Sequence, residues 1–449
     1  MNRSLPVIGV VGTGYVGLCT AVGFASRGFK VITSTSDKLK ADLINSGEPP
    51  FYEPGLKELL SGAVAAGNLR CTLDREETVL ESDVTFITVG TPSLQDGSID
   101  LSLVEASARD IGKALARKNK YHIVVVKSTV IPGTTVNLVK PTIEELSGKR
   151  AGIDFGLAMN PEFLREGSAL YDTFNPDRVV IGEFDKRSGD VLEELYNSFY
   201  SGKVPIIRTN PFTAELIKYA NNAFLALKIS FINTIANICE RVPDADVRDV
   251  AKAIGMDRRI SPLFLNAGVG FGGSCFPKDL KALIAYSKKE GYEPTLLQEV
   301  LRVNERQAIW IVDTAERKLG NLSGKVVAVL GLAFKPGTDD MREAPSIRIV
   351  KELLRRGAYV KAYDPAAIGN ARKIFGDKVK LCESIVDCIR GSDCCMIVTE
   401  WDEFKDLAPS FFKENMRRPF IIDGRRIYDP KLFRSELEFE AVGLGGRST

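Results

Sequence analysis

Residues 7–17 read Val-Ile-Gly-Val-Val-Gly-Thr-Gly-Tyr-Val-Gly, an apolar run that passes directly into a glycine-rich turn. The apolar run predicts a buried strand, and the residues after the turn predict a helix that reaches Arg27 and ends at Gly28. Residues 31–33, Val-Ile-Thr, predict the next strand. A strand, a glycine turn, a helix and a second strand form a βαβ unit, in which the start of the helix binds a pyrophosphate group.

Further apolar runs predict more strands of the same kind. They lie at residues 84–89, 123–126 and 179–181, and the first two end in the polar turns 90–92 and 127–129. Ligands bind at the carboxyl ends of parallel strands in such sheets. After residue 324 a second strand–turn–helix–strand unit extends to Asp364, but its turn lacks the full glycine pattern. The sequence predicts an α/β fold with two Rossmann-like doubly wound domains and a dinucleotide site in the first.

A long helical segment joins the two predicted domains. From Thr213, the expected N-cap, to Cys239 the chain is rich in Ala, Leu, Ile, Phe and Asn. Lys218 and Asn222 are four residues apart and share one face of this helix, although a solvated stripe would show the same spacing. We expect domain boundaries that give parts 1–205, 206–318 and 319–449.

Composition restricts the classes of partner. The 449 residues include 60 basic and 58 acidic side chains, a net charge of +2, so charge gives no reason to expect a nucleic acid or an anionic membrane as partner. The N-terminus enters the first strand without a long apolar leader, and we expect a cytoplasmic protein. His122 is the single histidine and precedes an apolar run, and the eight cysteines lack metal-binding spacing. We therefore expect neither a metal site nor a histidine-based triad.

One cysteine stands in a setting that suits reaction. Residues 270–280 read Gly-Phe-Gly-Gly-Ser-Cys-Phe-Pro-Lys-Asp-Leu. Pro277 suits the first position of a helix, and the unpaired N–H groups at a helix start favour a thiolate at Cys275. Asp279 would then lie on the same face as the sulfur. A buried cysteine beside a flexible loop is the alternative when this segment is taken alone.

Four motifs occur in order: GTGYVG from Gly12, NPEFLREG from Asn160, the helix with Lys218 and Asn222, and GFGGSCFPKDL from Gly270. Together they resemble the UDP-glucose 6-dehydrogenases of the UDP-glucose/GDP-mannose dehydrogenase family, and the likeness continues into residues 332–335 and 423–426. The resemblance implies oxidation of a UDP-hexose, UDP-glucose first, at C6 to the UDP-uronate with two NAD. It also implies a homodimer or larger homo-oligomer. Another UDP-hexose such as UDP-galactose or a 2-acetamido sugar, a two-electron hydroxy-acid dehydrogenase and a noncatalytic sensor stay open as alternatives.

The resemblance also implies roles for single residues. Cys275 would be the nucleophile, and Lys218 with Asn222 would stabilise the alkoxide formed during hydride loss. Positions matching Thr129, Glu162 and Asp279 would hold or activate water, with Glu162 also a general acid–base. The dinucleotide would contact Gly12, Gly14, Tyr15, Val16, Gly17, Thr35, Lys38, Thr91, Thr129, Glu166, Lys278 and Arg342. The nucleotide sugar would contact Glu162, Phe163, Leu164, Arg165, Lys218, Asn222, Phe264, Leu265, Gly270, Phe271, Gly272, Cys275, Phe334, Lys335 and Arg425, and Arg259 would reach it from a second copy.

Two positions depart from the pattern of the family. Thr35 stands where most relatives carry an acid that binds the ribose of NAD, so a 2′-phosphate would meet less repulsion, and hydroxyls beside Lys38 could hold it. We expect NAD as the cofactor, with NADP use left open. Asn266 stands where many relatives have lysine, which leaves the identity of the sugar open.

Overall fold

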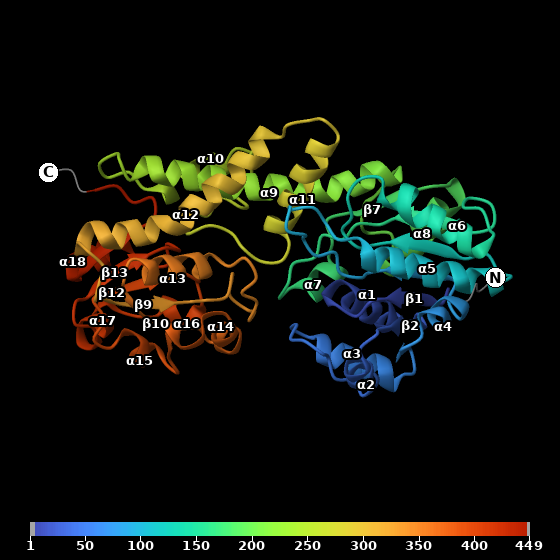
Figure 1. The fold of residues 1–449 in the computed structure, drawn as a ribbon, viewed down its shortest axis with the longest axis horizontal. Helices are drawn as coiled ribbons and strands as arrows, with labels where there is room; N and C mark the ends of the chain where they lie inside the picture. Colours follow the sequence, from blue (N-terminus) through green and yellow to red (C-terminus); the bar gives the residue numbers. More distant parts are fainter. Residues whose placement is uncertain (1–4, 447–449) are drawn as a thin grey trace. The chain divides into compact units, whose positions relative to one another are not determined.

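The computed structural model describes residues 5–446 and contains two separate β-sheets (Figure 1). The chain divides into two compact units whose border falls between Asn221 and Asn222. That border lies inside one long helix, α9 (Pro211–Cys239). The predicted division into three parts at residues 205 and 318 stays a prediction.

The first unit is built on an eight-stranded sheet with the order β3-β2-β1-β4-β5-β6-β7-β8. Its strands are β1 (Ile8–Val11), β2 (Val31–Ser34), β3 (Leu69–Thr72), β4 (Val84–Ile87), β5 (Ile123–Val126), β6 (Gly156–Met159), β7 (Val179–Glu183) and β8 (Ile206–Thr209). Neighbouring strands are parallel except for β6 and β7. The first six strands in this order have the arrangement of a dinucleotide-binding domain, which confirms the predicted Rossmann fold.

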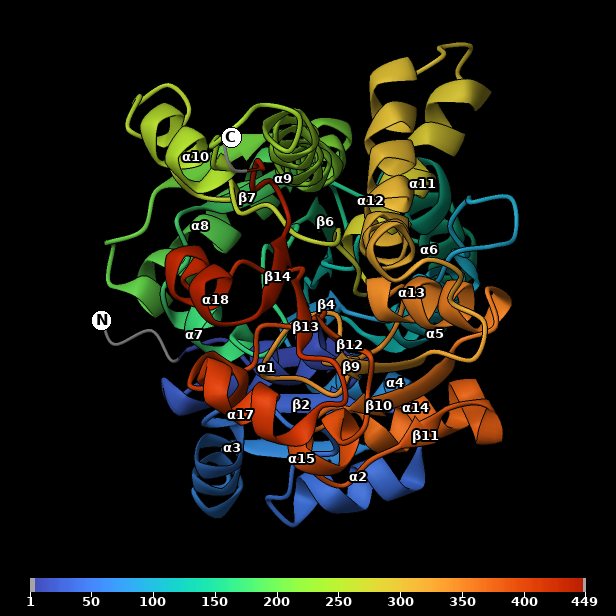
Figure 2. The same ribbon diagram turned by 90° about the vertical axis from the view of Figure 1, so that its left-hand side faces the viewer.

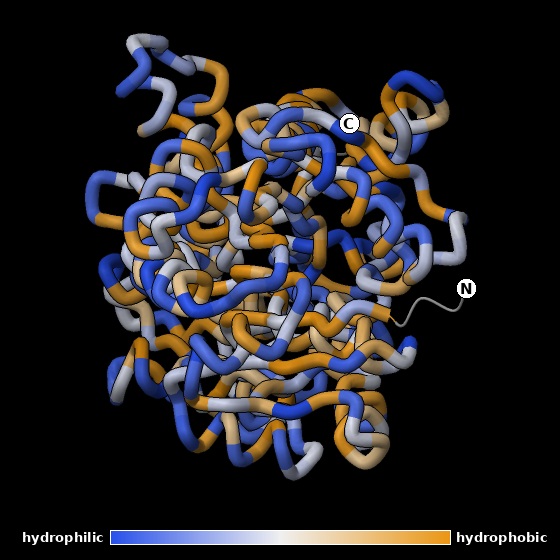
Figure 3. Tube along the Cα trace, turned by 90° about the vertical axis from the view of Figure 1, so that its right-hand side faces the viewer, coloured by the Kyte–Doolittle hydropathy of each residue, from blue (hydrophilic) through white to orange (hydrophobic). Residues whose placement is uncertain are grey.

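Apolar strands form because both faces of this sheet are covered. Val125 packs into one core cluster, whereas Val124 and Val126 pack into another on the opposite face. The covering helices are α1 (Tyr15–Ser26), α2 (Lys38–Asn45), α3 (Leu56–Ala65), α4 (Arg75–Leu80), α5 (Ser102–Arg117), the π-helix η1 (Thr135–Val139), α6 (Lys140–Ser147), α7 (Ala169–Phe174) and α8 (Lys186–Tyr200). Figure 3 shows the apolar segments as orange stretches, with many blue segments in the outer turns.

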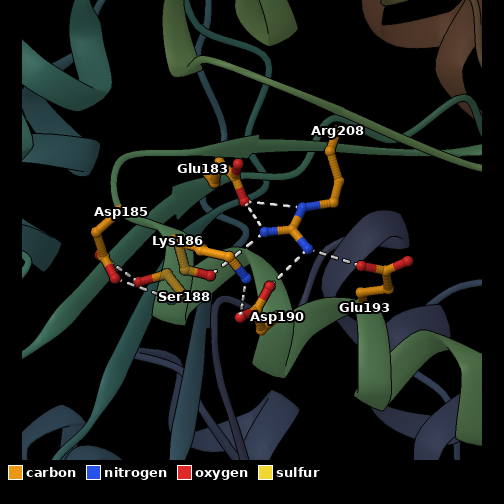
Figure 4. A network of polar contacts seen from close by, with 7 residues as sticks. All are labelled: Glu183, Asp185, Lys186, Ser188, Asp190, Glu193 and Arg208. Carbon is orange, nitrogen blue, oxygen red and sulfur yellow. Dashed lines mark hydrogen bonds and ion pairs between the residues drawn. The ribbon is translucent and has the colours of Figure 1, made fainter.

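An arginine holds the last strands of this sheet to α8 (Figure 4). Arg208 on β8 donates to Glu183 on β7, with one contact of 2.9 Å, and to Asp190 and Glu193 on α8 at 2.7 Å each. Gly189 allows this close approach, because a Cβ there would collide with the Glu183 carboxylate. The network is structural and fixes the edge of the first sheet.

Helix α9 begins earlier than the sequence predicts. It starts at Pro211, and the Asn210 side chain accepts the N–H of Thr213 at 2.9 Å, so the prediction of Thr213 as N-cap is wrong. Within residues 5–446, α9 alone is long and apolar enough to cross a membrane by length and composition. This is weak evidence, because the core helix of a soluble protein passes the same test, and α9 carries the buried polar residues Lys218, Asn222 and Asn233.

The second unit continues with three helices and a six-stranded sheet. The helices are α10 (Val247–Gly255), α11 (Phe276–Lys289) and α12 (Thr295–Leu319). The strands are β9 (Val326–Leu330), β10 (Tyr359–Tyr363), β11 (Lys380–Leu381), β12 (Cys394–Ile397), β13 (Phe420–Asp423) and β14 (Glu438–Ala441). All are parallel, in the order β11-β10-β9-β12-β13-β14, so the second predicted Rossmann-like domain is confirmed.

Helices cover both faces of this sheet (Figure 2). One face packs against α12, α13 (Pro345–Arg355) and α14 (Ile368–Phe375). The other packs against α15 (Ile385–Ile389), α16 (Asp402–Lys405), α17 (Pro409–Asn415) and α18 (Pro430–Glu436), while η2 (Gly376–Lys378) precedes β11. Alternate residues of β9 serve the two cores: Val327 and Val329 face the first group, and Ala328 and Leu330 face the second.

Candidate active site

The glycine turn after β1 is shaped to receive a phosphate-bearing ligand. Gly12 has a φ of +109°, and a Cβ on Gly17 would lie 2.1 Å from the carbonyl oxygen of Gly12. A Cβ on Gly14 would meet nothing within 4 Å. Gly14 caps α1 without a side-chain hydrogen bond, and the first turn has no acidic residue. The first N–H groups of α1, which include those of Tyr15 and Val16, therefore suit the pyrophosphate of NAD.

Strand β2 ends at Ser34, so Thr35 takes the position directly after the strand where the sequence comparison expects an acid. The N–H of Thr35 donates to the carbonyl of Thr72 at 3.1 Å. Asp37 caps α2 by accepting the N–H of Lys40, and Lys38 pairs with Asp42 at 2.7 Å. The acid closest in sequence to Thr35 is therefore used as a helix cap rather than placed at the end of the strand.

Glu162 and Lys218 form a buried ion pair in the first unit. The Lys218 Nζ lies 3.0 Å from Glu162 Oε1, and the two side chains are 4% and 8% exposed. Glu162 also accepts the N–H of Leu164 at 2.6 Å. Burial raises the pKa of Glu162, but the charge of Lys218 and these hydrogen bonds outweigh burial and hold the pKa below its ordinary value. The Lys218 ammonium is therefore held in a buried site, where it can donate to a developing oxyanion.

A second buried lysine acts on this pair through its charge, and the sequence motifs did not single it out as a site residue. Lys127 follows β5 and donates to the side-chain oxygen of Asn160 at 2.8 Å. Burial, opposed by the charge of Glu162 and aided by that of Lys218, lowers the pKa of Lys127 to about 8. A lysine directly after a four-residue buried strand was the available signal. Lys127 and Lys218 together outnumber the carboxylate of Glu162, so the site has a net positive charge, which stabilises an alkoxide.

Thr129 lies on a loop that is held at two points. The Thr91 hydroxyl donates to the Thr129 carbonyl at 2.8 Å. Farther along, the buried carboxylate of Glu215 accepts the N–H groups of Gly133 and Thr135 at 2.5 and 2.8 Å. Burial raises the pKa of Glu215 to about 7, against the hydrogen bonds that lower it. Glu215 lies three residues before Lys218 on α9, so it ties the Thr129 loop to the helix of the lysine.

The segment after Glu162 packs around Phe163. The Arg178 guanidinium lies 3.8 Å from the centroid of the Phe163 ring, and the Lys218 Nζ lies 5.5 Å from it. Arg165 contacts the carboxylate of Asp172 with hydrogen bonds of 2.6 and 3.0 Å. Its guanidinium, which we expected to bind the nucleotide sugar, is engaged within the first unit. Glu166 lies in the turn that leads to α7.

In the second unit Cys275 stands at the start of α11. It is the N-cap residue of that helix, and Pro277 is the second residue of the helix, one place after the predicted first position. Cys275 is exposed, whereas the other seven cysteines are buried. The Ser274 hydroxyl lies 3.6 Å from the Cys275 sulfur. An accessible sulfur at a helix N-terminus is the arrangement that favours a thiolate nucleophile.

Asn222, Asp279 and Lys278 form a polar cluster in the same unit. The Asn222 side chain donates to Asp279 Oδ2 at 2.6 Å, and Lys278 contacts Asp279 Oδ1 at 2.7 Å. Asp279 and Asn222 are buried. The structure thus brings together two residues expected to be catalytic with one expected to contact the dinucleotide, and Lys278 is paired within the chain.

The other predicted substrate contacts, and Arg342 of the predicted dinucleotide contacts, lie around the glycine segment or on the surface. Arg425 donates to the carbonyls of Val398 at 2.6 Å and Gly270 at 3.3 Å. Further positions are the buried Leu265, Phe264 with a φ of +64°, Phe334 against Gly273, and Lys335 with its Nζ 5.6 Å from the Phe334 ring. Arg259 and Arg342 each pair with the aspartate two residues earlier, Asp257 and Asp340, at 2.6 Å.

In the second Rossmann-like domain, an aspartate holds the turn after β9. Asp364 follows β10 and accepts the N–H groups of Leu332 and Ala333, which follow β9, at 2.7 and 3.0 Å. It also accepts the N–H groups of Ala366 and Ala367 at 2.9 and 2.8 Å. The amides of Leu332 and Ala333 are therefore satisfied by the chain itself, and a dinucleotide site in the first domain alone stays a prediction.

His122 has the structural role that the sequence predicted. It is fully buried, its Nε2 lies 2.9 Å from the Thr85 hydroxyl, and its Nδ1 lies 3.1 Å from both the Ser82 carbonyl and Lys118 Nζ. Burial and the charge of Lys118 lower its pKa to about 3, so it is neutral near pH 7. Within residues 5–446, no group of three or more His, Cys, Asp or Glu side chains could hold a metal ion.

Comparison with known proteins identifies the family of the chain. Residues 7–200 match the NAD binding domain of the UDP-glucose/GDP-mannose dehydrogenase family, residues 212–306 its central domain and residues 328–430 its UDP binding domain. The UDP-glucose 6-dehydrogenase AglM of Haloferax volcanii is 45% identical over 97% of this chain and 99% of its own length. TuaD of Bacillus subtilis, also a UDP-glucose 6-dehydrogenase, is 45% identical over 94% of this chain and 89% of its own.

Solved structures show the same likeness. A UDP-glucose dehydrogenase from Pyrobaculum islandicum is 42% identical, covers 99% of both chains and has a TM-score of 0.91. A UDP-D-ManNAc dehydrogenase from Pyrococcus horikoshii is 30% identical, covers 97% of this chain and 99% of its own, and has a TM-score of 0.85. The open glycine turn and the matched domain establish NAD as the cofactor of the first unit. The chain belongs to the UDP-glucose/GDP-mannose dehydrogenase family and is an NAD-dependent dehydrogenase.

Proposed function

We propose that the protein oxidises UDP-glucose at C6 to UDP-glucuronate, a four-electron reaction that uses two NAD and one water. The main support is the exposed sulfur of Cys275 at the start of α11. Oxidation of the C6 alcohol first gives an aldehyde, and a thiol nucleophile is needed only when that aldehyde is oxidised further. The UDP-glucose dehydrogenases above have higher identity and a higher TM-score than the UDP-D-ManNAc dehydrogenase, which supports glucose as the sugar.

The first half of the proposed reaction makes an aldehyde. NAD, when bound, accepts one hydride in each half of the reaction. Loss of a hydride from C6 requires the hydroxyl proton to leave, and negative charge develops on that oxygen. Lys218 would donate to this oxygen, with Asn222 one helical turn away on α9. Glu162 keeps the Lys218 ammonium in place, and Lys127 adds positive charge that acts on Lys218.

The second half makes the acid without releasing the aldehyde. The Cys275 thiolate adds to the aldehyde carbon, a C–S bond forms, and the former carbonyl oxygen takes a proton to give a thiohemiacetal. Loss of a second hydride and of the hydroxyl proton gives a thioester. Water then breaks the C–S bond and leaves the carboxylate and the free thiol. We propose that Asp279 orders this water, and that Thr129 and Glu162 contribute to its activation.

The ligand contacts inferred from the family are part of the same proposal. Gly12, Gly14 and Gly17 would bind the pyrophosphate of NAD, and the 163–165 segment, residues 264–272, Phe334, Lys335 and Arg425 would bind the UDP-sugar. Arg259 is 89% exposed, which suits a residue that reaches a second copy. Its guanidinium would have to exchange Asp257 for the ligand.

A homo-oligomer is also proposed, and the exposed face of α9 supports it. Phe224, Phe231 and Ile238 are spaced by seven residues and are 60%, 49% and 54% exposed. Apolar side chains at this spacing form a stripe on one side of a helix, which favours packing against another copy. Light scattering across a dilution series should give the mass of a dimer or larger species, and Phe231→Glu should shift that mass toward a monomer.

The central experiment counts products. Purified protein is incubated with UDP-glucose and NAD, and NADH and UDP-glucuronate are measured together. Two NADH per acid are expected, and a peptide containing Cys275 should carry the sugar as a thioester in an acid-quenched sample. One NADH per product would favour a two-electron dehydrogenase. Equal or faster oxidation of UDP-galactose or a 2-acetamido sugar would overturn the choice of glucose.

A further inference from the structure

The glycine-rich segment that leads to Cys275 is held by an asparagine on α12. The side-chain oxygen of Asn304 accepts the N–H of Phe271 at 2.7 Å, and its amide nitrogen donates to the Phe271 carbonyl at 2.9 Å. One carboxamide thus satisfies both backbone groups of one residue. A contact at two points fixes the orientation of the peptide as well as its position.

The packing around the segment makes its position specific. A Cβ on Gly270 would lie 2.7 Å from the Asn304 side-chain oxygen, and Gly270 has a φ of +104°. A Cβ on Gly272 would lie 2.5 Å from the carbonyl oxygen of Glu343, and one on Gly273 would lie 2.8 Å from the Phe334 ring. The backbone therefore approaches α12 on one side and residues 334–344 on the other, which only glycine permits at these places.

A further bond ties the end of the segment. The N–H of Gly273 donates to the carbonyl of Arg342 at 2.9 Å. Two residues later Cys275 begins α11, so the course of residues 270–273 determines where the sulfur lies. In the first half of this course, Asn304 holds both backbone groups of Phe271, while Arg425 donates to one carbonyl of the segment, that of Gly270, at 3.3 Å.

We propose that Asn304 is a positioning residue for Cys275: by clamping Phe271 it sets the place from which the sulfur attacks the substrate. The proposal rests on the proposed function, in which Cys275 is the nucleophile. Attack on an aldehyde requires the reacting atoms at near-contact distance, and a displacement of about 1 Å can reduce the rate about a hundredfold.

The chain contains a matched control for this contact. Asn45, at the end of α2, accepts the N–H of Cys71 at 2.7 Å and donates to the Cys71 carbonyl at 2.9 Å. This is the same two-point clamp in the first unit, on a residue outside the proposed machinery. Asn45→Ala therefore removes the same kind of hydrogen bonds as Asn304→Ala and leaves residues 270–275 unchanged.

The experiment compares wild type, Asn304→Ala and Asn45→Ala by acid formation, by melting temperature and by the rate at which iodoacetamide alkylates Cys275, followed by peptide mass. Both variants should lower the melting temperature. Asn304→Ala should also lower turnover about tenfold to a hundredfold, because the sulfur is misplaced. It should slow the alkylation of Cys275, since the thiolate loses its alignment with the start of α11. Asn45→Ala should leave turnover and Cys275 alkylation near wild type.

Unchanged turnover and alkylation in Asn304→Ala, or equal losses in both variants, would overturn the proposal. If Asn304→Ala does not fold, Asn304→Ser takes its place; its hydroxyl can keep one of the two bonds, and a smaller loss in both readouts is expected. Cys275→Ser separates this proposal from the proposed function. Normal acid formation by Cys275→Ser would refute the nucleophile, while the alkylation result for Asn304 would still stand.

Discussion

The Asn222 side chain donates a hydrogen bond of 2.6 Å to the Asp279 carboxylate, which joins helix α9 to the helix that begins after Cys275. The second oxygen of Asp279 contacts Lys278. A buried carboxylate with these two donors is held in one orientation, four residues from the proposed nucleophile. Its fixed oxygen atoms are suited to bind a water molecule that attacks a thioester.

Replacing this carboxylate should stop the reaction at a late step. Asp279→Asn keeps the shape of the side chain but removes its charge, so turnover should fall about a hundredfold or more. The Cys275 thioester should then accumulate and be visible by mass spectrometry after acid quenching. Asp377→Asn, on the exposed η2 turn, serves as the control and should behave as wild type. A full loss of activity without accumulated thioester would place Asp279 in an earlier step.

Removal of the buried ammonium should affect the first hydride transfer. Lys218→Met leaves Glu162 without its partner and removes the donor to the developing alkoxide, so turnover should fall about a hundredfold to a thousandfold. Rapid mixing with UDP-glucose and NAD should show the loss already in the first turnover. Lys228→Met, on the same helix, is the control, because the Lys228 Nζ donates to the backbone carbonyls of Ile260 and Ser261 at 3.0 and 3.2 Å. Near-normal turnover of Lys218→Met would refute the role given to the lysine.

The residue after β2 should set the choice of dinucleotide. Thr35→Asp restores the usual acid, so kcat/KM with NADP should fall about tenfold or more relative to NAD, because two negative charges would meet. Asp42→Asn should act in the opposite direction, since it releases Lys38 from its ion pair. Steady-state rates with both dinucleotides test both changes. An unchanged ratio in both variants would show that this loop does not contact the 2′ position.

Glu215 should make the stability of the protein depend on pH. Its pKa is raised from 4.5 to about 7 in the folded protein, so the folded state binds more protons than the unfolded state between these values. The stabilisation is complete below pH 4.5 and is lost as pH rises through about 7, with a total on the order of 3 kcal/mol. Glu215→Gln cannot ionise and should gain stability relative to wild type as pH rises from 5 to 8.

Differences in melting temperature between wild type and Glu215→Gln across this pH range test the prediction, with the exposed Glu145→Gln as control. The comparison with wild type cancels the contributions of groups that are common to both proteins. One such group is His122, whose lowered pKa makes stability increase as pH rises toward 6.5. A difference that does not change with pH would contradict the prediction.

The sequence predicts the two sheets well because buried parallel strands are almost wholly apolar. Residues 123–126 form β5 as expected, and the glycine turn after β1 stands where the motif placed it. Ends of elements are harder to predict. The expected strand 84–89 stops at Ile87, since the Thr88 hydroxyl turns back to the carbonyl of Val11, and α9 starts at Pro211 because Asn210 supplies the cap.

The supporting residues of the candidate site could not be predicted from local patterns. Asn304 lies 33 residues beyond Phe271, and Glu215 lies 80 residues beyond Thr135. In the sequence each is a polar residue within an ordinary helix, and only folding brings it to the loop that it holds. Motifs identify the residues expected to carry the chemistry, whereas the clamps that orient them depend on contacts between distant segments.

Asp364 has a consequence for the order of events in the proposed reaction. Because this carboxylate accepts the amides of the second Rossmann-like turn, we expect the turn after β1 to be the one dinucleotide cradle for a conversion that is proposed to yield two NADH. The first NADH must then depart and a fresh NAD must enter while the half-oxidised sugar is retained. Covalent tethering to sulfur would prevent its escape during this exchange, so the tether must outlast the time that cofactor replacement takes.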